Sequence, residues 1–307
     1  MEFLRPATWD EALAAKAENP SALPISGGTD VMVELNFDRH RPGALLDLNR
    51  ITELTEWESG SYEGQEGEVI RLGAAVPYAR ITKELSGPLQ GLSIAGNTVG
   101  SPQIRNRGSV GGNLGGASPA GDAHPALLAA GKDVFVEAES VRGTRLIAID
   151  DFYLGVKRNS LQPDELIRAI RIPVADGPQQ FSKIGTRNAM VIAVCAFGFA
   201  LHPPKEGGSA GTVGTGIGSA APTPRRAPEA EQFLADELAD RGLWQSGGLI
   251  GPAAIQRFGE LVSAAASPID DVRGSAAYRR HALAVMARRT LTWTWNEYTQ
   301  SLRSAAA

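Results

Sequence analysis

The sequence contains a single cysteine, Cys195, among 307 residues. A disulfide within the chain is therefore excluded, and an iron–sulfur or other metal site held by cysteines of this chain alone is all but excluded with it. Cys195 lies in the apolar run MVIAVCAFGFAL. There we expect a buried strand thiol and not a nucleophile.

Long apolar runs and strong net charge are also missing. No run approaches the ~20 residues of a membrane span, and the N-terminal stretch MEFLRPATWDEAL lacks the basic and apolar regions of a signal peptide. The formal net charge of −4 argues against nucleic acid or an anionic membrane as a main partner. We expect a cytoplasmic protein with no transmembrane segment and no nucleic-acid partner.

Sequence motifs that would let this chain catalyse a reaction by itself are scarce. The sequence holds no H-E-x-x-H and no C-x-x-C. A G-x-G-x-x-G does not follow the first predicted strand, which disfavours a Rossmann dinucleotide site. We therefore predict no catalytic residue and no metal ligand in this chain.

Glycine, in contrast, is concentrated in one segment, which we call the second glycine segment. It runs from Val99 to Pro125 and reads VGSPQIRNRGSVGGNLGGASPAGDAHP. Glycines allow the backbone to turn tightly and to approach a ligand closely, and such a loop can direct N–H groups at a phosphate. A flexible linker is the alternative, but Ile104, Val110 and Leu114 favour a packed segment.

A shorter motif, the first glycine segment, precedes it. Ser26-Gly27-Gly28-Thr29-Asp30 follows a predicted strand at 22–25 and leads into Val31, Met32 and Leu35 at helical spacing. This strand–turn–helix unit is a second candidate phosphate site. Two such segments suit a diphosphate, and a large cofactor that carries one would supply its own chemistry.

The remaining pattern predicts a mixed chain. Thr8 and Glu11 form a capping box before a helix. Asp122 is expected to cap a helix at 124–130, with His124 in a solvent-facing or capping position. Further strands are predicted at 44–48, 69–74, 133–138, 145–149 and, half-exposed, 165–172.

A change of composition at 174–180 predicts a domain boundary. Beyond it we predict strands at 181–186 and 191–201, a glycine-rich turn at 207–218, and helices at 227–239, 250–266 and 278–298. Trp293 and Trp295 of the last helix are candidates to anchor it to its own domain or to a partner.

Two stretches resemble a known pair of signatures. PISGGTDVMVE at 24–34 and SPQIRNRGSVGGNLGGASPAGDAHPALLA at 101–129 are similar to the FAD-binding signatures of the medium subunit of molybdenum hydroxylases, the group of xanthine dehydrogenase, carbon monoxide dehydrogenase and aldehyde oxidoreductases. DELIRAIRIP, FSKIGTRNAM, GSAAPTPRRAPEAEQFL and DDVRGSAAYRRHAL resemble later blocks of that family, in the same order.

The resemblance implies an α+β fold. Residues 1–175 would form an FAD-binding domain of the vanillyl-alcohol-oxidase (PCMH) type, with subdomains at about 1–57 and 58–175. Residues 176–307 would form a smaller C-terminal domain with a three-stranded antiparallel sheet and helices.

The resemblance also implies a cofactor site by position. The first glycine segment would wrap the FAD diphosphate, the second would form the opposing wall, and Asp122 would bond the ribityl or flavin region. Leu166 would pack on flavin or adenine, and Lys183 would be a polar contact to FAD. From its charge, and not from the resemblance, we expect the Lys183 cation to favour the reduced, anionic flavin. The residues that match are Ile25, Ser26, Gly27, Gly28, Thr29, Asp30, Val31, Ile104, Gly108, Ser109, Val110, Gly111, Gly112, Asn113, Asp122, Leu166 and Lys183.

The implied function is electron transfer within a complex. A large subunit would hold the molybdenum cofactor and a small subunit two 2Fe-2S clusters, in a dimer of heterotrimers. FAD on this chain would pass electrons to NAD or another acceptor, and xanthine or a related N-heterocycle would be the substrate. The alternatives are an aldehyde- or carbon monoxide-oxidising complex of the same family, a self-contained flavin oxidase, and a non-enzymatic nucleotide-binding protein.

Overall fold

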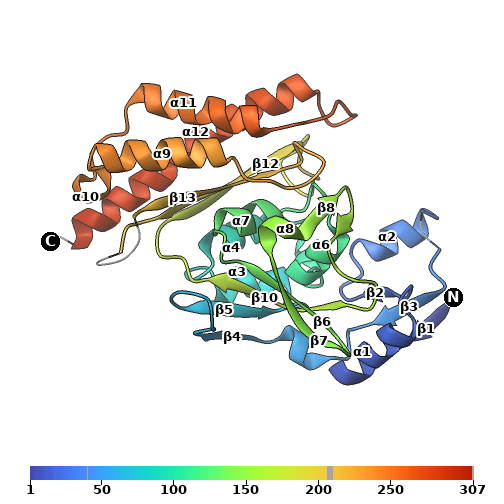
Figure 1. Ribbon diagram of the computed structural model, residues 1–307. Coiled ribbons are helices and arrows are strands. Elements are labelled where there is room, and N and C mark those ends of the chain that lie inside the picture. Colours follow the sequence, from blue (N-terminus) through green and yellow to red (C-terminus); the bar gives the residue numbers. More distant parts are fainter. Residues whose placement is uncertain (40, 206–209, 306–307) are drawn as a thin grey trace.

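The computed structural model describes residues 1–39, 41–205 and 210–305. The chain begins with a small parallel sheet in the order β1-β3-β2 (Figure 1), formed by β1 (Glu2–Leu4), β3 (Ala44–Asp47) and β2 (Leu23–Ile25). Helices α1 (Trp9–Glu18) and α2 (Val31–Asn36) connect these strands. The predicted capping box is confirmed, because the Thr8 side chain accepts from Glu11 N and the Glu11 carboxylate accepts in return from the Thr8 backbone.

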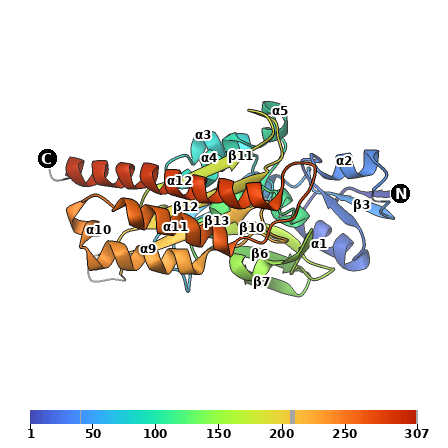
Figure 2. The same ribbon diagram turned by 90° about the horizontal axis from the view of Figure 1, so that it is seen from above.

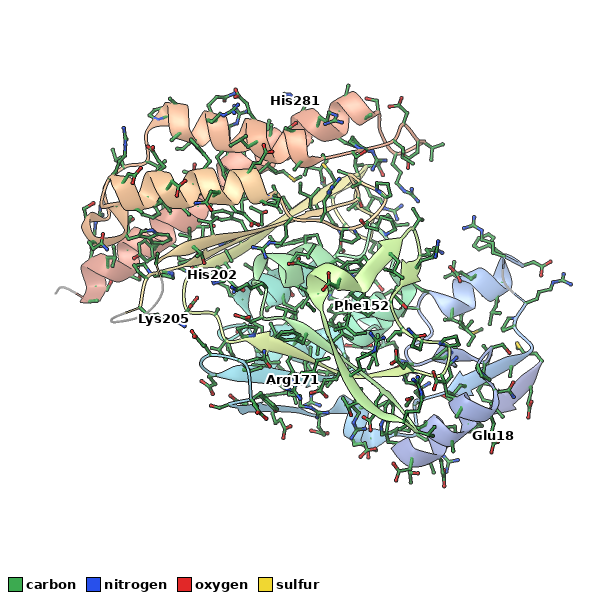
Figure 3. All side chains as sticks on the ribbon, in the orientation of Figure 1. Glu18, Phe152, Arg171, His202, Lys205 and His281 are labelled. Carbon is green, nitrogen blue, oxygen red and sulfur yellow. The ribbon has the colours of Figure 1, made fainter. Side chains whose placement is uncertain are left out.

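A five-stranded antiparallel sheet follows, in the order β4-β5-β10-β6-β7. Its strands are β4 (Trp57–Gly60), β5 (Val69–Gly73), β10 (Leu166–Pro173), β6 (Phe135–Ser140) and β7 (Gly143–Ala148), and a short 3-10 turn, η1 (Thr52–Thr55), precedes them. The half-exposed strand predicted at 165–172 is the central strand β10, and it is more buried than expected. Its basic side chains are covered by ion pairs: Arg171 (Figure 3) lies 2.6 Å from the buried Glu137.

Helices α3 (Tyr78–Glu84), α4 (Gln90–Asn97), α7 (Ala123–Ala129) and α8 (Ile149–Phe152) lie on the side of this sheet that faces the C-terminal part (Figure 1), and their buried side chains share one hydrophobic cluster with its strands. The second glycine segment, predicted as a loop, is partly helical, with α5 (Pro102–Arg105) and α6 (Val110–Gly116). Serine caps explain the difference, because Ser101 accepts from Ile104 N and Ser109 accepts from Gly112 N. A side-chain cap offsets part of the poor helix propensity of glycine.

The C-terminal part contains a three-stranded antiparallel sheet in the order β11-β12-β13. Its strands are β11 (Gln179–Ile184), β12 (Cys195–His202) and β13 (Thr212–Gly218). One face of this sheet is covered by α4 and α7 and the other by the C-terminal helices (Figures 1 and 2), which are α9 (Pro228–Asp240), α10 (Leu243–Ser246), α11 (Pro252–Ala265) and α12 (Ala276–Ala305). The predicted fold class is thus confirmed.

The glycine-rich turn predicted at 207–218 is wrong for residues 212–218, which form β13, and 206–209 lie outside the described residues. These glycines serve close packing. A Cβ on Gly214 would lie 1.9 Å from the carbonyl oxygen of Ala129, and one on Gly216 would lie 2.1 Å from that of Pro125. Helix α7 therefore rests directly on the backbone of β13.

The two parts of the chain meet along this sheet. Each part has its own cluster of buried hydrophobic side chains. The cluster of the N-terminal part also includes Phe181 of β11. At the junction His202 (Figure 3) lies 3.2 Å from Asp176, which also pairs with Lys205. The boundary at 175/176 and the subdomain limits stay predictions.

The last helix, α12, is fixed by one of its two tryptophans. The Trp295 side chain is buried and its Nε1 donates to Gly248 O at 2.9 Å, whereas Trp293 is exposed. No helix in the described part of the chain is long and apolar enough to cross a membrane.

Candidate cofactor site

The two glycine segments meet in the structure. A Cβ placed on Gly27 would lie only 1.9 Å from the carbonyl oxygen of Arg107, so the two backbones are in direct contact there. Close by, a Cβ on Gly108 would lie 3.5 Å from Thr29 Oγ1. Motifs about eighty residues apart in the chain therefore build one site, as the diphosphate hypothesis requires.

This site offers unused backbone donors. Within the described residues, no protein acceptor bonds the N–H groups of Gly27, Gly28, Thr29 or Ser109. Gly28 has φ 74°, a left-handed backbone that favours glycine and turns the chain into α2. Unpaired N–H groups on two touching turns are the donor set that binds phosphate oxygens.

Several predicted residues of the second glycine segment, in contrast, bond or pack against other parts of the protein. Gly111 N donates to Ala74 O at 3.2 Å, and Asn113 Oδ1 accepts from Ala123 N at 3.3 Å. The Val110 side chain is in the hydrophobic core. Asn113 thus holds the turn before α7 in place, a role that the sequence does not reveal.

Asp122 does not cap α7 with its side chain, contrary to prediction. Its Oδ2 instead lies 2.7 Å from Lys183 Nζ, which also donates to Thr98 O at 2.9 Å. Both side chains are nearly buried, with 10% and 8% exposed. Burial raises the pKa of Asp122, although Lys183 acts in the opposite direction. Because Lys183 belongs to β11, this ion pair joins the C-terminal sheet to the second glycine segment.

The prediction of a solvent-facing or capping His124 is wrong. Its ring is fully buried, and Nδ1 lies 2.8 Å from the hydroxyl of Tyr153. A Cβ on Gly121 would lie 2.4 Å from His124 Nε2, so the ring packs tightly beneath the turn that carries Asp122. Burial lowers the pKa of His124 to about 3. The imidazole is therefore neutral at neutral pH.

This burial predicts a pH dependence of stability. Below the ordinary pKa of 6.5, His124 binds a proton in the unfolded chain but stays neutral in the folded chain. The free energy of unfolding therefore falls as the pH drops toward 3. We expect this residue to reduce the free energy of unfolding by roughly 2 kcal/mol between pH 7 and pH 5. Urea unfolding of the wild type and of His124→Asn at both pH values tests this. An equally steep loss in the variant would contradict it.

Tyr78 belongs to the site, although nothing in the sequence marked it. Its ring packs against Gly96 and Gly108. Burial raises the pKa of Tyr78, and the nearby carboxylates of Asp122 and Asp30 raise it further. Within the described residues, the buried atoms Tyr78 OH and Asp122 Oδ1 have no hydrogen-bond partner. Such atoms mark a polar environment that the protein alone leaves incomplete.

Leu166, Arg105 and Arg107, three further residues in or near the candidate site, make contacts within the protein. The Leu166 side chain is buried in the hydrophobic core. Arg105 donates to Val99 O at 3.1 Å, and Arg107 donates to Asn49 Oδ1 at 2.8 Å. Arg105 thus bonds within the second glycine segment, and Arg107 links that segment to Asn49. In the described part of the chain, no group of three or more His, Cys, Asp or Glu residues could hold a metal ion.

Comparison with known proteins identifies the family. Residues 1–175 match the family described as "FAD binding domain in molybdopterin dehydrogenase", and residues 180–294 match "CO dehydrogenase flavoprotein C-terminal domain". The nicotinate dehydrogenase FAD-subunit of Eubacterium barkeri is 34% identical over 67% of this chain and 70% of its own length. The xanthine dehydrogenase FAD-binding subunit of Escherichia coli O157:H7 is 28% identical over 94% of each.

A solved structure shares the fold. Carbon monoxide dehydrogenase from Hydrogenophaga pseudoflava, in a form that lacks the Mo-pyranopterin moiety, contains a chain that superposes with a TM-score of 0.83 at 24% identity, over 97% of this chain and 98% of that one. The chain therefore belongs to the family of FAD-binding medium subunits of molybdenum hydroxylases, and it is the flavoprotein subunit of an oxidoreductase.

Proposed function

We propose that this chain holds FAD across the two glycine segments, with its diphosphate on the N–H groups of Gly27, Gly28, Thr29 and Ser109. The observation that carries the proposal is the direct contact of the two segments at Gly27, together with these unpaired donors. Asp122 and Lys183 would stand beside the bound cofactor and set its charge environment. FAD itself would supply the redox chemistry.

We further propose that the chain relays electrons within a complex. They would come from two 2Fe-2S clusters of a small partner subunit and leave to NAD or another acceptor, while a large subunit oxidises substrate at a molybdenum cofactor. The single cysteine supports this division, because the chain cannot ligate such clusters by itself. A dimer of heterotrimers is the assembly we propose.

An N-heterocycle such as xanthine is the substrate class that we propose for the complex. Two relatives that match this chain are named for nicotinate and xanthine, both of which are N-heterocycles. Carbon monoxide is the alternative suggested by a relative at 26% identity, the medium chain of carbon monoxide dehydrogenase.

Reconstitution of the purified chain with FAD tests the proposal. We expect a flavin absorption band near ~450 nm and no oxidation of alcohols, aldehydes or N-heterocycles by the chain alone, since the cofactor supplies the redox chemistry and partners supply the substrate site. A colourless product would contradict FAD binding. Substrate turnover by the isolated chain would instead support a self-contained oxidase. Co-purification with an iron–sulfur and a molybdenum polypeptide from the native host would establish the complex.

A further inference from the structure

A small hairpin beside the site has no role in the function proposed so far. It consists of β8 (Tyr153–Gly155) and β9 (Arg158–Asn159), with Lys157 at its tip in a left-handed backbone conformation, φ 54°. Leu154 and Val156 are each 59% exposed. Since these apolar side chains stay largely in solvent, polar contacts must hold the tip in place.

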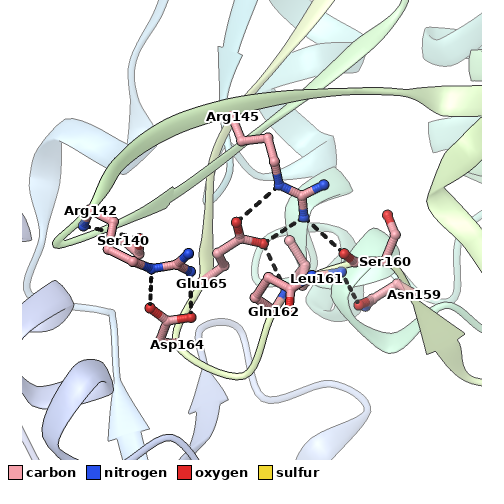
Figure 4. A network of polar contacts seen from close by, with 9 residues as sticks. All are labelled: Ser140, Arg142, Arg145, Asn159, Ser160, Leu161, Gln162, Asp164 and Glu165. Atoms are coloured by element: carbon pink, nitrogen blue, oxygen red, sulfur yellow. Dashed lines mark hydrogen bonds and ion pairs between the residues drawn. The ribbon is translucent and has the colours of Figure 1, made fainter.

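The hairpin is hydrogen-bonded to the second glycine segment both at β9 and at its tip. Asn159 Nδ2 donates to Gly115 O at 3.0 Å, and Lys157 N donates to Ala117 O at 3.2 Å. Ser160 directly follows β9, and its carbonyl oxygen accepts a hydrogen bond from Arg145, which also pairs with Glu165 at 2.8 Å (Figure 4). The hairpin is therefore hydrogen-bonded to the C-terminal end of α6 at two points.

The tip reaches the other segment. Lys157 Nζ donates to the carboxylate of Glu34 on α2, the helix that directly follows the first glycine segment. Burial raises the pKa of Asp30, while the charge of Lys157 lowers it and that of Glu34 raises it, so Asp30 lies near both of these side chains. In Figure 1, α2 lies on the side of the first subdomain that faces β8 and α6. The contact thus joins the two halves of the site on the side of α2.

We propose that Lys157 and Glu34 form a clasp that retains the cofactor by fixing α2, and with it the first glycine segment, against the second. This inference rests on the proposed FAD site. Lys157 also offsets two carboxylates, Glu34 and Asp30, that would otherwise repel an anionic diphosphate. Lys157 and Glu34 are positioning residues.

The clasp and a purely local charge effect predict opposite results for one variant. If the Lys157–Glu34 contact retains FAD, removing the Glu34 charge breaks that contact and speeds FAD release. If Glu34 acts only by repelling the diphosphate, removing its charge slows FAD release. We expect Lys157→Gln and Glu34→Gln each to release FAD about fivefold faster at low salt, the upper end for an exposed ion pair. The double variant should be no faster than either single one.

FAD release is followed by the rise in flavin fluorescence after dilution of the FAD-loaded chain. We expect the difference from wild type to vanish near ~1 M salt, where the pair is screened, and the exchange Glu34→Lys with Lys157→Glu to restore part of the retention. Arg158→Gln, a charge change on the same hairpin, is the matched control and should release FAD at the wild-type rate.

Three results would overturn the clasp: unchanged release in both single variants, slower release in Glu34→Gln, or additive effects in the double variant. A wild-type chain that retains no FAD would instead refute the proposed function on which the clasp rests. Thermal unfolding of each apoprotein shows whether a faster release comes from general destabilisation.

Discussion

Gly27→Ala is expected to weaken FAD binding by at least about a hundredfold. A Cβ at this position would lie 1.9 Å from the Arg107 carbonyl oxygen, a backbone atom that cannot rotate away. The two segments must then separate, and N–H groups on one of them lose the diphosphate. Loss of two hydrogen bonds to a charged group costs about 3 kcal/mol, which is about a hundredfold in Kd. Titration of the apoprotein with FAD, followed by flavin fluorescence, measures this.

The matched control is Gly43→Ala. Gly43 directly precedes β3 of the same small sheet, and a Cβ there would meet no atom within 4 Å. We expect its FAD affinity to equal that of the wild type. Circular dichroism and thermal unfolding of both apoproteins separate lost binding from lost folding. Wild-type affinity in Gly27→Ala would show that the two segments need not touch to bind FAD.

The sequence indicated both glycine segments but not their contact. Glycine density and the strand–turn–helix pattern are local signals, whereas the contact of Gly27 with Arg107 depends on how two separate sheets are placed. The positions of Tyr78 and His124 have the same origin. A lone tyrosine or histidine has no periodic signal, and Tyr78 and His124 are buried only because of how α3 and α7 pack in the folded chain.

The errors in the fold prediction also have physical causes. Glycines at 212–218 looked like a turn because their absence of side chains is usually read as flexibility. In β13 the same absence lets α7 lie on the sheet, which is a tertiary requirement. Likewise, the arginines of β10 suggested exposure, yet the buried Glu137 pairs with Arg171 and Arg71. Ion pairing between strands distant in sequence cannot be seen in a single strand.

Lys183→Met is expected to destabilise the chain by about 3 kcal/mol at pH 8. It removes one partner of a nearly buried pair and leaves the Asp122 carboxylate without its cation. The companion Asp122→Asn in the same chain should recover most of this loss, because no uncompensated charge remains. Lys205→Met, which breaks an exposed contact to Asp176, is the control and should cost less than about 1 kcal/mol. Urea unfolding measures all three.

The pH dependence of that loss has a definite sign. Burial already raises the pKa of Asp122, and without Lys183 the pKa rises further. The folded variant then takes up a proton at a pH where the unfolded chain has not, so its deficit relative to wild type shrinks from pH 8 to pH 5. A deficit that grows over this range would contradict the assignment.

In the proposed FAD complex, the same ion pair would set the charge that the flavin experiences. Lys183 alone would favour the reduced, anionic cofactor, but Asp122 at 2.7 Å offsets much of its field. We therefore expect Lys183→Met to lower the midpoint potential of the bound flavin and Asp122→Asn to raise it, as measured by spectroelectrochemical titration at pH 8, where Asp122 has not yet taken up a proton. Opposite shifts cannot come from general loosening of the site, which would move both variants alike. Unchanged flavin content and potential in Lys183→Met would exclude this role for the lysine.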